Sequence, residues 1–288
     1  MYKKILVPLD FSQASRDAIS FAEELVNEKG QIHLMHVFPS KIREAIAFFE
    51  VPEKVKEMEK KVEFLRSQAQ QELAKFSAEL EKRGFTVKSI FIEGDPVNSV
   101  IAESSRDYDL VIIGIPRNRV QVANTALSIA KGVSPSCLVI KESRVKPKFD
   151  KVLFAADFSD ASKTAFKDIV PKFQKKFNSQ VTVLNVFELH PLPYIEQGTA
   201  FLVGDIEDIK KNLQKRLALE YPGDVTYSVV EGAEAGVEIV DFAEKGKYNI
   251  IILTFEKREW VERAFLGSVS TKVVKLTRLP VLIYRKVK

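Results

Sequence analysis

The stretch ILVPLDFSQAS (residues 5–15) decides the fold, because it returns later in the chain as VLFAADFSDAS (residues 152–162). In each copy a short apolar run ends in Asp-Phe-Ser, and a segment with a helical pattern follows. A duplicated strand–loop–helix unit indicates two copies of one domain. Any function must therefore be sought in two sites, or in one body built from two similar halves.

Later segments repeat in the same order. A Glu-Gly pair occurs at 93–94 and again at 231–232. An apolar run that follows a tyrosine occurs at 108–113 and 248–253, and a final apolar run occurs at 136–140 and 279–283. The spacing between the copies drifts with loop length, but the order does not change. Chance similarity between apolar strands would not preserve DFSxAS together with that order.

The length of 288 residues also predicts two domains, which we place at residues 1–141 and 151–288 with a linker at 142–150. A hydrophobic content of 45% suits two ordinary soluble cores. The net charge of +5 is mild, and acidic and basic residues alternate, so we expect no nucleic-acid partner. No stretch approaches the roughly 18 apolar residues of a membrane span, so we expect no membrane partner either.

The start of the chain and its single cysteine suggest a cytoplasmic protein. The first apolar run, Ile5 to Leu9, is too short for the core of a signal peptide. Cys137 cannot form an intrachain disulfide, which favours a reducing compartment. Because Cys137 directly precedes an apolar strand, we expect a buried structural thiol.

Strands and helices are predicted to alternate along both halves. The expected strands are residues 5–9, 32–38, 86–92, 110–115 and 138–140 in the first half, and 152–156, 181–187, 225–230, 250–254 and 281–284 in the second. Apolar runs of this length between helices favour parallel sheets covered on both faces. With right-handed crossovers, each half becomes a doubly wound five-stranded α/β domain.

The helices differ between the halves. In the first half we expect Ser12 to cap a helix that Gly30 stops, and a long helix to begin near Pro52. That helix carries one continuous apolar stripe: Val55, Met58, Val62, Leu65, Ala69, Leu73, Phe76 and Leu80. In the second half the matching helix is expected from Asp205, and Pro171 is expected to kink or end the preceding one early. We interpret both stripes as core rather than as partner surfaces.

Both halves resemble the universal stress protein family. The resemblance rests on KKILVPLDFSQAS (3–15), EGDPVNSVIAESSRDYDLVIIG (93–114) and LGSVSTKVVKLTRLPVLIY (266–284). It implies a tandem member with two domains of the adenine nucleotide alpha hydrolase-like type and a non-enzymatic role in the stress response. It also implies that strands 138–140 and 281–283 pair across the domains as an intramolecular pseudo-dimer. A homodimer and an unidentified protein partner stay open.

Nucleotide-binding members of the family carry a glycine, two residues, a second glycine, nine residues and then Gly-Ser or Gly-Thr. The amides of such a loop wrap phosphates, and glycine permits the close approach. The second half keeps the ending, Gly267-Ser268, with Thr254 and Lys257 at the earlier glycine positions. The resemblance implies a site there for ATP or a related adenine nucleotide, with Mg only if the nucleotide is bound. Its residues are Asp157 at the adenosine end, Gly267, Ser268 and Val269 at the phosphates, Thr254, and Lys257 compensating by charge.

The first half departs further from this pattern. Gly114 fits the first glycine position, but Arg117 stands at the second, and Asn124-Thr125 replaces Gly-Ser after only six residues. The residues Asp10, Gly114, Arg117, Asn124 and Thr125 therefore form the weaker of the two candidate sites. A structural alternative applies to the second half, in which Gly267-Ser268 is a helix start and Asp157 is a helix-capping residue.

No motif for catalysis or metal binding is found. The sequence has no Walker A loop, no GxGxxG after a strand and no Gly-x-Ser-x-Gly elbow. His33 and His36 lie three apart on a strand and so point to opposite faces, and His190 is distant in sequence. We expect no catalytic residue and no metal. The alternatives to a nucleotide-binding stress protein are a ligand-free scaffold using the long helix, and a slow ATPase or nucleotide switch.

Overall fold

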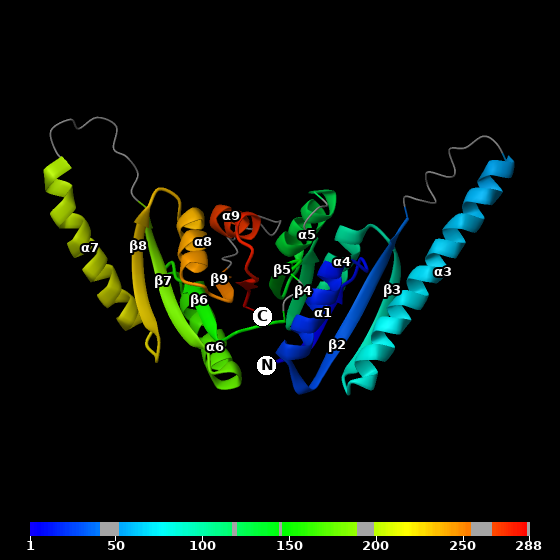
Figure 1. Cartoon of the computed structure of the whole chain (residues 1–288), viewed down its shortest axis with the longest axis horizontal. Helices are drawn as coiled ribbons and strands as arrows, with labels where there is room; N and C mark the ends of the chain where they lie inside the picture. Colours follow the sequence, from blue (N-terminus) through cyan, green and yellow to red (C-terminus); the bar gives the residue numbers. More distant parts are fainter. Residues whose placement is uncertain (41–51, 117–119, 144–145, 189–198, 255–266, 287–288) are drawn as a thin grey trace. The chain divides into compact units, whose positions relative to one another are not determined.

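The computed structural model describes residues 1–40, 52–116, 120–143, 146–188, 199–254 and 267–286 (Figure 1). The chain divides into two compact units, Met1–Pro147 and Lys148–Lys286. None of the helices in the described residues is long and apolar enough to cross a membrane.

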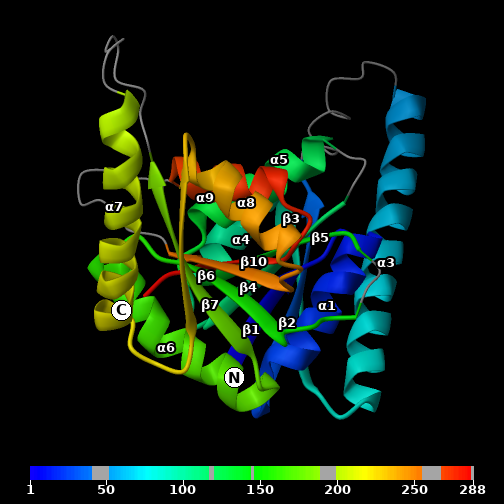
Figure 2. The ribbon, with the colours of Figure 1, turned by 60° about the vertical axis from the view of Figure 1, so that its left-hand side comes forward.

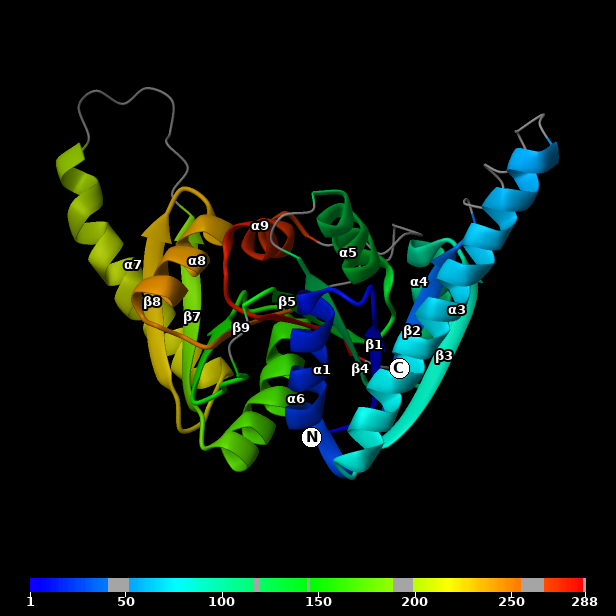
Figure 3. The ribbon, with the colours of Figure 1, turned by 45° about the vertical axis from the view of Figure 1, so that its right-hand side comes forward.

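The first unit contains five parallel strands in the order β3-β2-β1-β4-β5. The strands are β1 (Tyr2–Pro8), β2 (Val26–Pro39), β3 (Thr86–Gly94), β4 (Leu110–Ile115) and β5 (Ser136–Lys141). The helices are α1 (Gln13–Leu25), α3 (Pro52–Lys82), α4 (Pro96–Ser104) and α5 (Val120–Gly132). Right-handed crossovers place α1 and α3 on one face, which Figure 3 turns toward the viewer, and α4 and α5 on the other.

The second unit repeats this topology, with parallel strands in the order β8-β7-β6-β9-β10. Its strands are β6 (Lys151–Ala155), β7 (Gln180–Glu188), β8 (Thr226–Gly232), β9 (Ile250–Thr254) and β10 (Val281–Tyr284). Its helices are α6 (Asp160–Phe177), α7 (Thr199–Glu220), α8 (Ala235–Lys245) and α9 (Ser268–Leu276). Figure 2 shows α7 alongside β7 and β8. The predicted pair of doubly wound five-stranded sheets is confirmed.

The first helix ends earlier than predicted. Helix α1 stops at Leu25, and Val26 already belongs to β2, where it pairs with Tyr2. Gly30 lies inside β2, and a Cβ there would come within 2.5 Å of Val26 Cγ2 and 2.9 Å of the Lys3 carbonyl oxygen. Gly30 therefore permits a close approach of β2 to β1, and the prediction that it stops the helix is wrong.

In the second unit the predicted start of α7 and the predicted early end of α6 at Pro171 are also wrong, while the kink expected there as the alternative stays a prediction. Helix α7 begins at Thr199 and not at Asp205, because the single glycine at 204 lowers helix propensity by only about 1 kcal/mol. Helix α6 continues through Pro171 to Phe177. Val170 and Phe173, on either side of the proline, are buried, and their burial offsets the roughly 3 kcal/mol cost of an interior proline.

The long helix α3 extends from Pro52 to Lys82, as predicted, and packs on β2 and β3. Its 31 residues span about 46 Å. Leu73, Phe76 and Leu80 of the apolar stripe are buried, but Leu65 of the same stripe is 50% exposed. The stripe is therefore core at its carboxyl-terminal end and only partly so in its amino-terminal half.

Candidate functional site

An Asp-Phe-Ser turn follows the first strand of each domain. Phe11 and Phe158 have φ angles of 61° and 62°, a left-handed conformation that costs a residue with a Cβ roughly 1–2 kcal/mol. Asp10 Oδ1 accepts hydrogen bonds from the Ser12 amide (3.0 Å) and the Ser12 hydroxyl (2.5 Å). Asp157 Oδ1 accepts the same pair from Ser159, at 3.0 and 2.7 Å. The turn thus fixes one carboxylate at the carboxyl edge of each sheet.

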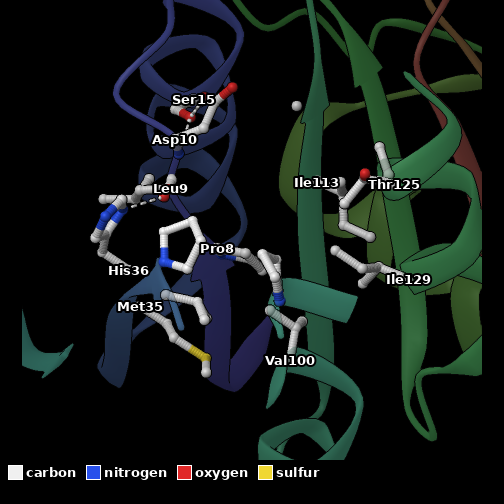
Figure 4. A pocket seen from close by; sticks show the side chains of 15 residues that line it. Pro8, Leu9, Asp10, Ser15, Met35, His36, Val100, Ile113, Thr125 and Ile129 are labelled. Atoms are coloured by element: carbon white, nitrogen blue, oxygen red, sulfur yellow. Dashed lines mark hydrogen bonds between the residues drawn. The ribbon is translucent and has the colours of Figure 1, made fainter. Parts of the chain in front are cut away.

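A cavity of about 320 Å³ lies in the first domain (Figure 4). It is formed by the carboxyl ends of β1, β2 and β4 together with α4 and α5. Strands β1 and β4 diverge here, and such a switch point is where open α/β sheets bind ligands. Most of the wall is apolar, and the lining residues outside that group are Asp10, Ser15, His36, Gly114 and Thr125.

Ser15 and His36 hold the edge of this cavity in place. The Ser15 hydroxyl donates to Asp10 Oδ1 (2.5 Å) and accepts from the Asp10 amide (3.0 Å). His36 Nδ1 donates to the Leu9 carbonyl oxygen at 2.8 Å, and its ring stacks on Phe11 with centroids 4.4 Å apart. Burial lowers the pKa of His36 below 6.5, so the imidazole is neutral at pH 7.

The second domain builds the same turn with other side chains. Asn185 Nδ2 donates to the Ala156 carbonyl oxygen at 2.8 Å, in the place that His36 takes in the first domain. The Tyr221 hydroxyl accepts from the Phe158 amide and donates to the Ser162 hydroxyl, both at 3.0 Å. Burial of Tyr221 raises its pKa, so the hydroxyl stays protonated and keeps donating.

Of the helix starts for which the structure describes an N-cap residue, those of α8 and α9 have no side-chain cap, and the N-cap residue of α9 is a glycine. Ser12, Asp95 and Ser159 cap α1, α4 and α6 with their side chains, whereas no side chain among the described residues caps α9. Its N-cap, Gly267, has φ −55° and ψ 160°, a conformation open to any residue. A Cβ at Gly267 would contact nothing within 4 Å. Neither backbone conformation nor packing within the described residues requires glycine there.

In the first domain the structure brings three of the predicted site residues together. Asp10, Gly114 and Thr125 line the cavity, while Asn124 is exposed and not part of the lining. Arg117 lies outside the described residues. A Cβ on Gly114 would come within 2.3 Å of the Ala14 carbonyl oxygen. Close packing of α1 on β4 therefore already accounts for this glycine.

The second-domain residues lie on three elements that meet the carboxyl edge of their sheet. Asp157 is exposed after β6, Thr254 is half-buried at the end of β9, and Gly267, Ser268 and Val269 begin α9. Lys257 lies outside the described residues. The sequence analysis missed the lining residues of the first domain that read as ordinary core: His36 and Met35 on β2, and Pro96 and Val100 on α4. The place of Pro96 at the start of α4 is a signal that could have found it, whereas Met35, His36 and Val100 lie inside their elements and carry no such signal.

The described residues contain no group of three or more His, Cys, Asp or Glu side chains placed to hold a metal ion. Cys137 is fully buried in β5, as predicted.

The comparisons with known proteins agree on one family. The family model for the universal stress protein family matches residues 1–141 and 148–285. Two universal stress proteins of Methanocaldococcus jannaschii are 31% and 28% identical to this chain over 147 and 156 residues. Those matches cover 49% and 48% of this chain, and 84% and 96% of the relatives.

Solved structures share the fold over almost the whole chain. A universal stress protein from Archaeoglobus fulgidus superimposes with a TM-score of 0.64 at 20% identity, covering 98% of both chains. A functionally unknown protein from Pseudomonas aeruginosa has a TM-score of 0.64 at 15% identity, covering 98% of this chain and 92% of its own.

Proposed function

The chain belongs to the universal stress protein family, with one such domain in each half, and we propose that it is a non-enzymatic stress-response protein that binds ATP or a related adenine nucleotide in its second domain. The observation that carries this proposal is the amino end of α9, where the N-cap residue is Gly267 and no described side chain caps the helix. The first amides of a helix lack intrahelical partners and carry partial positive charge, so they attract phosphate.

Gly267 gives a ligand access to those amides. A side chain at position 267 would contact nothing in the described protein, so packing does not explain the glycine. The close approach of a phosphate to the backbone is a physical reason for a residue without a side chain. Asp157 stands at the same edge of the sheet, and both of its described hydrogen bonds go to Oδ1. Oδ2 is therefore open to a hydroxyl or amino group of the adenosine moiety.

Isothermal titration of the full chain with ATP tests the proposal. Gly267→Asp places a carboxylate where the phosphates would bind, so we expect at least tenfold weaker binding. The fold should tolerate the change, because aspartate is a favourable N-cap and the space is open. The control is Gly223→Asp, at another exposed glycine of the same domain where the nearest atom to a Cβ is 3.7 Å away. An unchanged Kd in Gly267→Asp, or no saturable ATP binding by the wild type, would contradict the proposal.

A ligand-free scaffold is the second candidate function, and one observation favours it. Phe64 and Leu65, adjacent on α3, are 63% and 50% exposed. If they form a partner surface, Phe64→Ser/Leu65→Ser should abolish binding of a cross-linked partner and leave ATP titration unchanged. Release of ADP is measured in the same samples, and turnover lost in Gly267→Asp would indicate an ATPase instead.

The family resemblance further supports a proposal about assembly. Strands β5 and β10, each last in the strand order of its domain, are proposed to pair with one another within a single chain. Both strands are mostly apolar, and a strand at a sheet edge presents a row of backbone N–H and C=O groups with which another strand can pair.

A further inference from the structure

We propose that the first-domain cavity binds an uncharged ligand of nucleoside size that carries hydroxyl or amino hydrogens, and that it rejects nucleotides. This is a second site, on the other domain from the nucleotide site proposed above. The inference rests on the charge of the cavity, on the occupation of nearby amides and on the packing role of its glycine.

The charge of the cavity disfavours an anion. Asp10 is the one charged residue among the described lining residues, which include no lysine or arginine. For the other titratable lining residue, His36, burial lowers the pKa and so favours the neutral imidazole. A phosphate entering the cavity would thus meet a fixed carboxylate with no cation among the described lining residues to offset the repulsion.

At the described starts of α1 and α4, amides that could hold a phosphate already donate to oxygens of the protein. At the start of α1, the Ser12 amide donates to Asp10 Oδ1 and the Ser15 amide donates to the Ser12 hydroxyl at 3.3 Å. At the start of α4, Pro96 has no N–H, and the Asn98 amide donates to Asp95 Oδ1 at 2.9 Å. The carboxylate of Asp95 therefore occupies the anion position of the helix that borders the cavity.

Gly114, the residue that fits the first glycine of the family's phosphate loop, has another explanation. A Cβ there would overlap the backbone of Ala14, so the glycine lets α1 pack on β4. It does not indicate a backbone left open for phosphate. The amino end of α9 in the second domain shows the opposite combination, with open space at its glycine and no described cap.

The cavity nevertheless suits a neutral ligand. Met35, Val100, Ile113 and Ile129 offer apolar walls for a ring system. The four described hydrogen-bonding contacts of the Asp10 side chain and amide leave Oδ2 to accept from a hydroxyl or amino group. The volume of about 320 Å³ lies at the lower end of the roughly 300–1,000 Å³ of small-molecule pockets. A nucleoside matches this combination of size, ring and hydroxyl groups.

Adenosine and AMP, which differ by one phosphate, are the probes. Both are titrated into the full chain carrying Gly267→Asp, which weakens phosphate binding in the second domain, and only the part of the adenosine binding that the cavity variants below abolish is counted for the cavity. We expect adenosine to bind at least tenfold more tightly than AMP. AMP binding as tight as adenosine would overturn the inference, and so would the absence of adenosine binding.

Two variants assign the binding to the cavity. Ala126→Leu adds bulk to the lining and should abolish adenosine binding, whereas Ser128→Leu, on the exposed side of the same helix, should not change it. Asp10→Asn keeps an oxygen that can accept from Ser12 and Ser15 but removes the charge. The preference for adenosine over AMP should shrink several-fold in Asp10→Asn, and an unchanged preference would contradict the role of the carboxylate. Thermal melting checks that each variant is folded.

The two proposals can fail separately. If ATP binding is lost in Gly267→Asp but adenosine binding remains, both are supported. If ATP still binds Gly267→Asp and competes with adenosine, the inference about the cavity is wrong, although the chain does bind nucleotide. If ATP binds only at Gly267 and adenosine binds nowhere, the nucleotide site alone is supported.

Discussion

At the scale of single residues, the two domains repeat backbone contacts more faithfully than side chains. Asp109 Oδ2 accepts from the Lys3 and Lys4 amides at 2.6 and 3.0 Å, and Asn249 Oδ1 accepts from the Lys151 amide at 2.8 Å. These side chains precede the fourth strand of each domain and tie it to the first. An aspartate and an asparagine can both make this contact, because each has a side-chain oxygen that accepts a hydrogen bond from an amide.

His33 gives the first domain a predictable response to acid. It is 4% exposed, and its Nδ1 lies 2.8 Å from the Tyr108 hydroxyl, which donates to Glu103 Oε1 at 2.8 Å. Burial, and after it the charges of Lys4 and Lys88, lower the pKa of His33 to about 4, and Glu103 opposes them. Between pH 6.5 and about 4, His33 is therefore protonated in the unfolded chain but neutral in the folded chain. Stability must fall as the pH drops through this window and stay level above it.

The contribution of His33 to the free energy of unfolding is expected to fall by about 2 kcal/mol between about pH 7.5 and pH 5. Native-state hydrogen exchange of β2 amides measures it within the first domain. His33→Gln keeps a hydrogen bond to Tyr108 but cannot titrate, so its loss over the same interval should be smaller by about that amount. His36→Gln is the comparison variant, because burial lowers the pKa of His36 too. A pH response unaltered in His33→Gln would contradict the assignment.

At the scale of elements, α3 should behave differently at its two ends. Leu73 is 2% exposed, so Leu73→Ala is expected to cost about 2–5 kcal/mol of unfolding free energy. Leu65, on the same stripe, is 50% exposed, and Leu65→Ala should change stability by no more than about 0.5 kcal/mol. Urea unfolding of the two variants makes the comparison. Similar losses would show that the amino-terminal half of the stripe is covered in solution.

The elements also show what the sequence can and cannot predict. Strand β9 is predicted to the residue because its apolar run is bounded by polar residues. The end of α1 is not, because Val26 fits the helical stripe and only its pairing with Tyr2 draws it into β2. The continuation of α6 past Pro171 likewise depends on the burial of Val170 and Phe173 in the tertiary structure, which helix propensity alone does not predict.

The candidate site follows the same division. The ends of the apolar runs predicted that Asp10 and the loop after Ile113 would lie at one edge, and the family resemblance selected Gly114 and Thr125; all three residues line the cavity. His36 and Val100 were not selected, because they read as strand and helix interior. Only the tertiary arrangement, with β2 beside β1 and α4 packed on β2 and α5, places these two residues in the wall of the cavity.

At the scale of the whole molecule, the proposed pairing of β5 with β10 has a distinctive signature in hydrogen exchange. Amides of a strand point alternately to its two neighbours, so a bare edge strand protects every second amide. If β5 and β10 pair, consecutive amides in both strands should exchange slowly. Strands β3 and β8, at the other ends of the two strand orders, provide the control and should show the alternating pattern.

A homodimer would also protect consecutive amides, so concentration decides between the two arrangements. Pairing within a chain should give the same protection at every concentration, with a monomer mass of 32.6 kDa in light scattering. Protection that fades on dilution would indicate pairing between chains. An alternating pattern in β5 and β10, like that expected for β3 and β8, would contradict pairing within and between chains. Both strands would then be unpaired along one edge.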